Sequence, residues 1–355
     1  MKAAVVIGKG QVVIEEIPKP EPGPGKLLLK VLYCSICGRD VERVYNQDWD
    51  VATSDQLAIM KGSILGHEYV AAVEAIGEEV TGWKTGDRAV LVHSSCGNCF
   101  YCRRGMNELC LGGRVRGYPA DGTPSRIPGP PREGALAEYI LRPVRMCLRV
   151  PASVPDQDAA MTEPLATGVT AVLNAGVQLG DAVAVIGVGH VGLMVLAAAK
   201  AAGAAPLIAI DMKHDRLDIA RQMGANYVID AAKVDPINEA VKITEAGPDI
   251  AFVCTSFSAK GVVEQAFEMV RYHGRVMIIG GAAPAILDSE KWMRKEVRVE
   301  GTVHQCEEMS RALNIIESKR VDVKPTISEV VPLEQVQRAF ESLHTGQNIA
   351  VLVKP

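Results

Sequence analysis

The sequence lacks several features that define large classes of proteins. It has no strong excess of either charge, since 38 Lys and Arg stand against 42 Asp and Glu, and this balance argues against a nucleic-acid binder. Its longest apolar stretches, such as 191–199, are far shorter than the roughly 20 residues that cross a bilayer. Glu15 and Glu16 follow closely after the first residues, and no long apolar region with a cleavage site, as in a signal peptide, precedes them. We therefore expect a cytoplasmic protein with no membrane or nucleic-acid partner.

The sequence also lacks internal repeats, low-complexity tracts and the composition of a disordered chain. Hydrophobic residues make up 48% and charged residues 23% of its 355 residues, which is ordinary for a globular protein. At roughly 150 residues per domain, this length predicts two domains.

Cysteine occurs in an odd number, nine, which does not suit a disulfide scaffold. Four of the nine are spaced C-x2-C-x2-C-x7-C, at Cys96, Cys99, Cys102 and Cys110. A loop with this spacing can wrap four sulfurs around one point, and zinc accepts such a tetrahedral thiolate cage. Because all four positions are filled, the pattern predicts a structural zinc. Four unrelated core cysteines or an iron–sulfur cluster are the weaker alternatives.

A glycine-rich loop lies between a predicted strand and a predicted helix. The β-branched run 183–186 is followed by Gly187-Val188-Gly189-His190-Val191-Gly192, and an Ala-rich segment then extends to about 202. In this setting G-x-G-x-x-G is the dinucleotide fingerprint, in which the glycines let the backbone approach a pyrophosphate at the helix N-terminus. We interpret His190 as a polar residue that opens the helix rather than as a catalytic one.

An acidic residue follows the next predicted strand, at Asp211, 19 residues after the last glycine. Its carboxylate is suited to accept hydrogen bonds from a ribose diol and would repel a 2′-phosphate, which favours NAD over NADP. Lys213 and Arg216 lie nearby and weaken that preference, and Arg216 is counted among the cofactor-binding residues.

Alternation of strands and helices continues after the loop. Further strands are predicted at 206–210, 227–230, 249–254, 275–279 and 297–303, with helices at 215–223 and 260–271. This pattern predicts a doubly wound parallel sheet of about six strands. Ligands of such sheets bind at the carboxyl ends of the strands, so Thr255 and Gly280 should border the cofactor together with Asp211. The first 150 or so residues, rich in Gly and Pro with short β-branched runs, predict an irregular, barrel-like β domain.

The chain as a whole resembles the zinc-containing medium-chain alcohol dehydrogenases, most closely the polyol (sorbitol-like) and threonine dehydrogenases. The resemblance covers nearly all of it and rests on both loops and on the motifs Ile36-Cys37-Gly38-Arg39-Asp40, Leu65-Gly66-His67-Glu68, Gly86-Asp87-Arg88, Gly134-Ala135-Leu136-Ala137-Glu138-Tyr139 and Glu163-Pro164-Leu165-Ala166-Thr167-Gly168. It implies an α/β fold with a GroES-like irregular β-barrel catalytic domain at 1–152 and 302–355. A Rossmann NAD-binding domain at 153–301 and a homodimer or homotetramer are also implied.

The resemblance also implies a catalytic zinc held by Cys37, His67 and Glu68, with Glu163 supplying a further ligand or a water-bridged neighbour. A thiolate, an imidazole and a carboxylate leave one position on zinc open, where the metal acts as a Lewis acid toward an alcohol that gives its hydride to nicotinamide. Asp40 matches the family's acid that orients the histidine through its other ring nitrogen. Each residue alone suits an ordinary structural role, but the set in this order favours the metal site.

Two positions depart from the family's pattern. The residue after Gly38 is normally Ser or Thr, whose hydroxyl relays the substrate proton, and here it is Arg39. Where a relay histidine is frequent, the chain has Glu42. Because arginine is not a base at neutral pH, proton release would run through Glu42, His93 or water. Tyr45, Trp49 and His93 are further candidates near the zinc.

Arg39 itself admits several interpretations. Its guanidinium could hold a carboxylate or phosphate of the substrate in a two-pronged contact. It could instead pair with Glu68, Glu163 or the cofactor pyrophosphate, or turn outward into solvent.

Three functions are compatible with these residues. The first is an NAD-dependent zinc dehydrogenase that acts on a secondary alcohol of a polyol, sugar acid or amino alcohol, a small molecule that could be anionic. The second is a biosynthetic dehydrogenase for a cyclitol, an aminosugar or another elaborate intermediate. The third is a catalytically idle nucleotide-binding relative. The presence of the complete zinc ligand set argues against this third function.

Overall fold

The computed structural model describes residues 1–45, 61–92, 98–106, 110, 133–256, 259–280, 283–302 and 308–355. The chain divides into two compact units, the first comprising Met1–Glu163, Gln305–Leu313 and Ile327–Pro355, the second Pro164–His304 and Asn314–Thr326. The sequence predicts boundaries at 152 and 302. Residues 314–326 belong to the second unit, because the turn η5 (Lys324–Thr326) packs against helix α6 (His214–Met223). In the described ranges, every helix is too short or too polar to cross a membrane.

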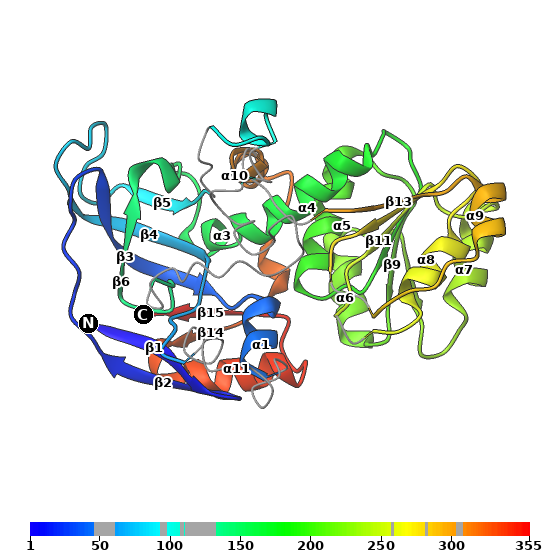
Figure 1. Cartoon of the computed structure of the whole chain (residues 1–355). Helices are drawn as coiled ribbons and strands as arrows, with labels where there is room; N and C mark the ends of the chain where they lie inside the picture. The colour runs from blue at the N-terminus through cyan, green and yellow to red at the C-terminus, as the bar shows by residue number, and fades with distance from the viewer. Residues whose placement is uncertain are drawn as a thin grey trace. The chain divides into compact units, whose positions relative to one another are not determined.

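The first unit is built on a seven-stranded mixed sheet (Figure 1). Its strands are β3 (Lys26–Ser35), β4 (Glu68–Ile76), β5 (Arg88–Leu91), β6 (Tyr139–Pro143), β7 (Cys147–Arg149), β14 (Ile327–Pro332) and β15 (Ala350–Lys354), and a separate hairpin joins β1 (Lys2–Gly8) to β2 (Gln11–Glu16). The long strand β3 pairs with β4 on one side and with β6 and β15 on the other. Its register with β4 shifts twice, and such irregularities bend a sheet.

The described helices of this unit are α1 (Gly38–Tyr45), α3 (Asp156–Ala160) and α11 (Val336–His344), and α10 (Glu308–Glu317) begins in the first unit and ends in the second. The core alternates along β3, where Leu27, Leu29 and Val31 are buried together with Phe340 of α11. The rings of Tyr45 and His344 stack with centroids 4.0 Å apart. This contact fixes the end of α1 on α11.

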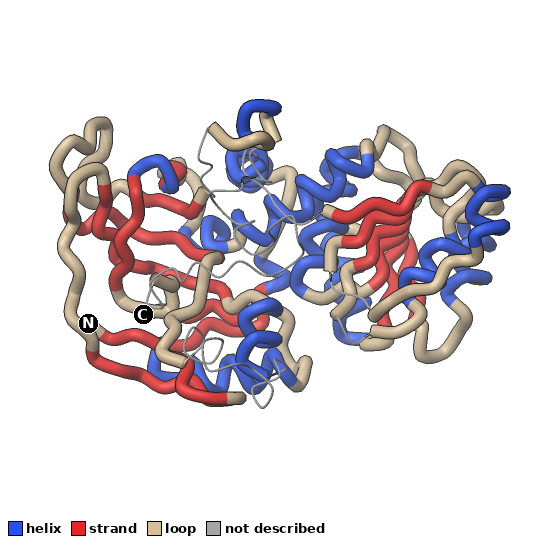
Figure 2. Tube along the Cα trace, viewed as in Figure 1, coloured by secondary structure: helices blue, strands red, loops and turns tan. Residues whose placement is uncertain are grey.

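The second unit is a parallel six-stranded sheet in the order β10-β9-β8-β11-β12-β13 (Figure 2). Its strands are β8 (Val183–Ile186), β9 (Leu207–Asp211), β10 (Tyr227–Asp230), β11 (Ile250–Val253), β12 (Arg275–Ile278) and β13 (Arg298–Gly301), and its helices are α4 (Thr162–Ala175), α5 (His190–Ala202), α6, α7 (Pro236–Thr244), α8 (Val262–Met269) and α9 (Ser289–Lys295). Helices α5 and α6 cover one face and α7 and α8 the other (Figure 1). The predicted doubly wound sheet is therefore confirmed.

Local sequence explains the limits of several of these elements. Strand β8 is buried at all four residues, as expected for a central parallel strand. Helix α5 ends at Gly203, which adopts a left-handed φ of 91°. Helix α7 begins after Asp235, whose side chain accepts a hydrogen bond from the amide of Ile237. The reversal of strand order between β8 and β11 creates the crevice where ligands of such sheets bind.

Candidate functional site

Cys37, His67 and Glu68 form a compact group in the first unit. Their ligand atoms, one from each residue, all lie within 4.8 Å of one another. The pairing of β3 with β4 produces this proximity, because Ser35 at the end of β3 lies opposite Glu68 at the start of β4. Chain segments on either side of two adjacent strand ends therefore deliver the three side chains to one place.

The donor set fits a divalent metal. Zinc bonds of roughly 2.0–2.3 Å place tetrahedral ligand atoms somewhat under 4 Å apart. The three ligand atoms would therefore have to move only slightly closer together to bind zinc. Burial, and then the charge of Glu68, raises the pKa of the Cys37 thiol to about 12. Burial lowers the pKa of His67, but Asp40 and Cys37 outweigh it and hold that pKa well above its ordinary value. The negative charge of Glu68 opposes ionisation of the Cys37 thiol, and a cation between the two groups would relieve that repulsion.

Asp40 lies behind the histidine. Its Oδ2 is 3.5 Å from His67 Nδ1, and its side chain is only 1% exposed. A carboxylate beside Nδ1 is suited to orient the ring with Nε2 toward a metal, which is the role that the family resemblance implies for Asp40. Helix α1 positions the carboxylate, since the amides of Asp40 and Val41 both bond to the carbonyl of Cys37.

Two glycines allow the histidine segment to pack as it does. Gly66 has a φ of +99°, and a Cβ there would lie 2.7 Å from Cys34 Sγ. A Cβ on Gly134 would lie 2.0 Å from the carbonyl oxygen of Leu65. The amide of Ala135 donates to the carbonyl of Gly66, so the two segments run side by side. The motifs at 65–68 and 134–139 thus pack against each other and together hold His67 in place.

The remaining catalytic candidates lie in different settings. Glu163 is buried near the start of α4, but its carboxylate is not part of the group of three. Arg39 is exposed, and among the described residues it forms no ion pair, so the predicted pairing with Glu68 or Glu163 is wrong. Glu42 is half-buried on α1. Two further candidates, Trp49 and His93, lie outside the described residues.

The sequence motifs do not predict one contact that supports the group of three. The amide of Ile36 donates to the carbonyl of Val351 in β15, which anchors the residue next to Cys37. No local signal in the sequence links two segments more than 300 residues apart.

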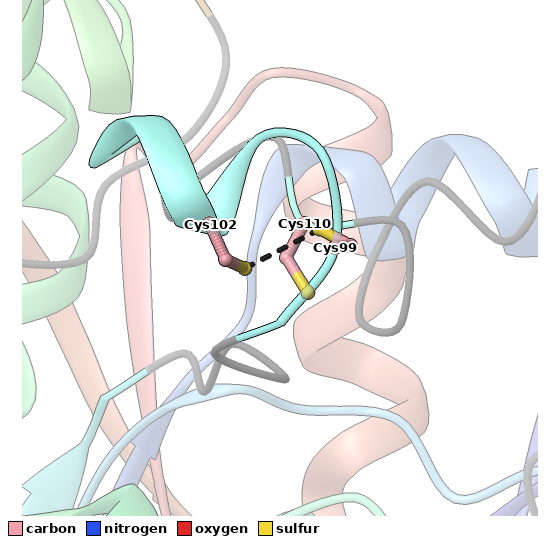
Figure 3. A group of neighbouring side chains, drawn as sticks. All are labelled: Cys99, Cys102 and Cys110. Atoms are coloured by element: carbon pink, nitrogen blue, oxygen red, sulfur yellow. Dashed lines mark hydrogen bonds between the residues drawn. The ribbon is translucent and has the colours of Figure 1, made fainter.

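A second cysteine group lies in the loop around η1 (Cys102–Arg104), as Figure 3 shows. Ligand sulfurs of Cys99, Cys102 and Cys110 lie within 4.8 Å of one another, and the first two are 3.4 Å apart. Gly105 closes the turn with a left-handed φ of 78°. The predicted fourth ligand, Cys96, lies outside the described residues. Three sulfurs converging from one short loop fit a thiolate metal cage.

The glycine-rich loop has the geometry of a nucleotide site. Gly187 follows β8 with a φ of +86°, and Gly189 directly precedes α5. A Cβ on Gly187 would lie 2.8 Å from Thr255 Cγ2, and one on Gly280 would lie 2.4 Å from the carbonyl oxygen of Thr255. Gly187, Thr255 and Gly280 therefore meet at the carboxyl ends of three adjacent strands. His190 and Val191 begin the helix, where Val188 and Gly192 are buried beside them.

Asp211 is held firmly at the end of β9. Its carboxylate accepts hydrogen bonds from the amides of Val188, Met212 and Lys213, at 2.8–3.0 Å. Arg216 Nη1 lies 3.8 Å from the same carboxylate and faces Gly189. Backbone amides thus fix the orientation of the acid, and a cation stands directly beside it.

Comparison with known proteins decides the family. The model of the alcohol dehydrogenase GroES-like domain matches residues 23–152, and that of the zinc-binding dehydrogenase matches residues 191–318. Human sorbitol dehydrogenase is 30% identical over 99% of this chain and 94% of its own. The chain belongs to the zinc-containing medium-chain alcohol dehydrogenases.

Solved structures of this family agree with the fold. An alcohol dehydrogenase from Thermus sp. ATN1 is 29% identical, with a TM-score of 0.85 over 100% of this chain and 99% of that one. A Sinorhizobium meliloti protein described as a zinc-binding dehydrogenase and bound to NADP is 26% identical, with a TM-score of 0.86 over 100% and 99% of the two chains. The predicted combination of a GroES-like domain and a Rossmann-like sheet is therefore confirmed, and zinc and a nicotinamide cofactor follow from membership of the family.

Proposed function

We propose that this dehydrogenase oxidises a secondary alcohol of a polyol, sugar acid or amino alcohol, with NAD as the hydride acceptor. The observation that carries the proposal is the convergence of Cys37, His67 and Glu68, with Asp40 behind the histidine. Zinc, when bound, supplies a Lewis acid that polarises the alcohol oxygen. A homodimer or homotetramer is proposed from the family resemblance, and a cytoplasmic location from the sequence features given above.

The chain's own residues would each have a defined part. Cys37, His67 and Glu68 would hold the catalytic zinc, and Asp40 would keep the proton of His67 on Nδ1 so that Nε2 faces the metal. Glu163, outside the group of three, would supply a further ligand or a water-bridged neighbour of the zinc. The backbone amides at the start of α5 would bind the pyrophosphate of the cofactor.

The direct test is NADH formation from NAD by zinc-loaded protein, combined with metal analysis. We expect turnover of at least one polyol, sugar acid or amino alcohol, and two zinc ions per chain. A protein that binds NADH but holds one zinc and oxidises none of these alcohols would instead be a catalytically idle relative.

The structural zinc gives the first prediction from a substitution. Replacing Cys102 by serine should lower the zinc content from two ions per chain to one, because a hydroxyl is a poor zinc ligand beside thiolates. Melting temperature should fall by several degrees, since a bound structural metal contributes folding free energy. Inductively coupled plasma analysis and calorimetry measure both effects. Cys147→Ser is the control, because Cys147 bonds to the carbonyl of Pro143 and belongs to neither metal group.

Asp211 gives a prediction about cofactor choice. The wild type should prefer NAD, and Asp211→Ser should lower kcat/KM for NAD by roughly tenfold or more while raising it for NADP. The reason is that the substitution removes a negative charge and leaves Arg216 available for a 2′-phosphate. Asp230→Ser is the matched control, because Asp230 occupies the equivalent position on the neighbouring strand β10. A wild type that prefers NADP would contradict the assignment.

A further inference from the structure

We propose that Arg39 binds an oxyanion on the substrate, a carboxylate or a phosphate ester, so that the enzyme selects acidic alcohols over neutral ones. This inference rests on the proposed function and narrows the substrate class of the same site. Arg39 is exposed, and no contact in the described residues explains why an arginine stands at this position.

The first step of the argument is position. Arg39 is the second residue of α1, and the helix begins on the carbonyl of Cys37, which accepts the amides of Asp40 and Val41 at 2.9 and 3.2 Å. Residues two apart in one helical turn have Cα atoms roughly 5–6 Å from each other. A side chain as long as arginine's therefore has the reach to meet a molecule held beside Cys37.

The second step is that no residue in the described ranges forms an ion pair with Arg39. Arg39 is exposed, and in the part of the chain that the structure describes it makes no ion pair, whereas Arg43 on the same helix lies 3.7 Å from Asp40. A cation in the first turn opposes the helix dipole. Arg43, four residues on, repels Arg39, and Glu42, three residues on, attracts it.

The third step is the charge of the surroundings. Asp40 and Glu68 are both buried carboxylates at 1% exposure, and Cys37 binds a metal as a thiolate. An acidic substrate meets repulsion there unless a cation outside the metal group compensates for it. Arginine suits this role, because its planar guanidinium donates two parallel hydrogen bonds to a carboxylate or phosphate. A neutral polyol requires no such group.

The test compares substrates that differ at one terminal group. Sorbitol is paired with gluconate, which carries a carboxylate instead of one hydroxymethyl group, and with sorbitol 6-phosphate. In Arg39→Gln, the kcat/KM ratio of acidic to neutral substrate should fall roughly 10- to 100-fold, mainly through KM, since a hydrogen bond to a charged group is lost. Arg39→Lys should lower this ratio less than Arg39→Gln does, because lysine keeps the positive charge but lacks the two parallel N–H donors of the guanidinium.

The control is Arg145→Gln, which removes an exposed arginine of the same unit that has no ion pair among the described residues and belongs to no site above. The kcat/KM ratio of acidic to neutral substrate in Arg145→Gln should equal that of the wild type. A loss confined to gluconate assigns a carboxylate, and one confined to sorbitol 6-phosphate assigns a phosphate. Equal losses for acidic and neutral substrates in Arg39→Gln overturn the inference.

A binding measurement separates this inference from the proposed function. Calorimetric titration of the zinc-loaded protein with gluconate and with sorbitol 6-phosphate, without nucleotide, involves no turnover. At least one of the two should bind the wild type about tenfold or more tighter than Arg39→Gln. Absence of that difference overturns the role of Arg39 even if alcohols are oxidised. If no alcohol is oxidised but the difference is present, the proposed reaction fails and the oxyanion site stands.

Discussion

Replacing Cys37 by serine should lower kcat by roughly a thousandfold or more and reduce zinc from two ions per chain to one. The expectation follows from the geometry, since Cys37 is the only thiol in a group whose ligand atoms all lie within 4.8 Å of one another. A serine hydroxyl does not replace a thiolate at neutral pH. Loss of a Lewis acid costs several kcal/mol of transition-state stabilisation, and 1.36 kcal/mol corresponds to a factor of ten in rate.

Metal analysis, steady-state kinetics and NADH binding should be measured on the same preparation. NADH should bind Cys37→Ser as it binds the wild type, because the nucleotide loop belongs to the second unit. Asp40→Asn provides a graded comparison, since it removes the charge behind His67 without removing a ligand, and it should cost about 10- to 100-fold. Two zinc ions per chain and near-normal turnover in Cys37→Ser would show that this group is not the catalytic metal site.

The features that could be predicted from the sequence are those encoded by neighbouring residues. The strand 183–186, the glycine loop and the following helix lie where the pattern predicts them, because one short segment contains the whole signal. The six-stranded sheet was predicted from repeated alternation of short apolar runs and helices. Grouping of three of the four clustered cysteines likewise follows from their close spacing.

Features that depend on distant segments were not predicted. Strand β15 pairs with β3 across some 300 residues. The hydrogen bond from the Val188 amide to Asp211 forms only once β8 and β9 lie side by side. Assignment of 314–326 to the second unit depends on packing against α6, which leaves no local pattern.

The tightest packing in the nucleotide loop leads to the second large effect. A Cβ on Gly192 would lie 1.9 Å from the carbonyl oxygen of Gly187, an approach that only a shift of the backbone relieves. Gly192→Ala should therefore move the start of α5 away from the loop. We expect the Kd of NADH to rise roughly 100-fold, since displacements of about 1 Å at a binding site have effects of this size. Overpacking of about 1–3 kcal/mol should also lower Tm by some 5 °C.

Gly189→Ala separates the two consequences. Gly189 has an ordinary φ of −78°, and the nearest atom to its Cβ would be Arg216 Nη1 at 3.6 Å, which is normal contact. This variant should have the same melting temperature as the wild type. It should nevertheless bind NADH more weakly, because the added methyl group lies where the backbone must approach the pyrophosphate. Fluorescence titration of NADH and calorimetry of both variants measure the difference. Wild-type melting and NADH affinity in Gly192→Ala would mean that the loop absorbs the methyl group, and the contact between Gly187 and Gly192 would then not determine cofactor binding.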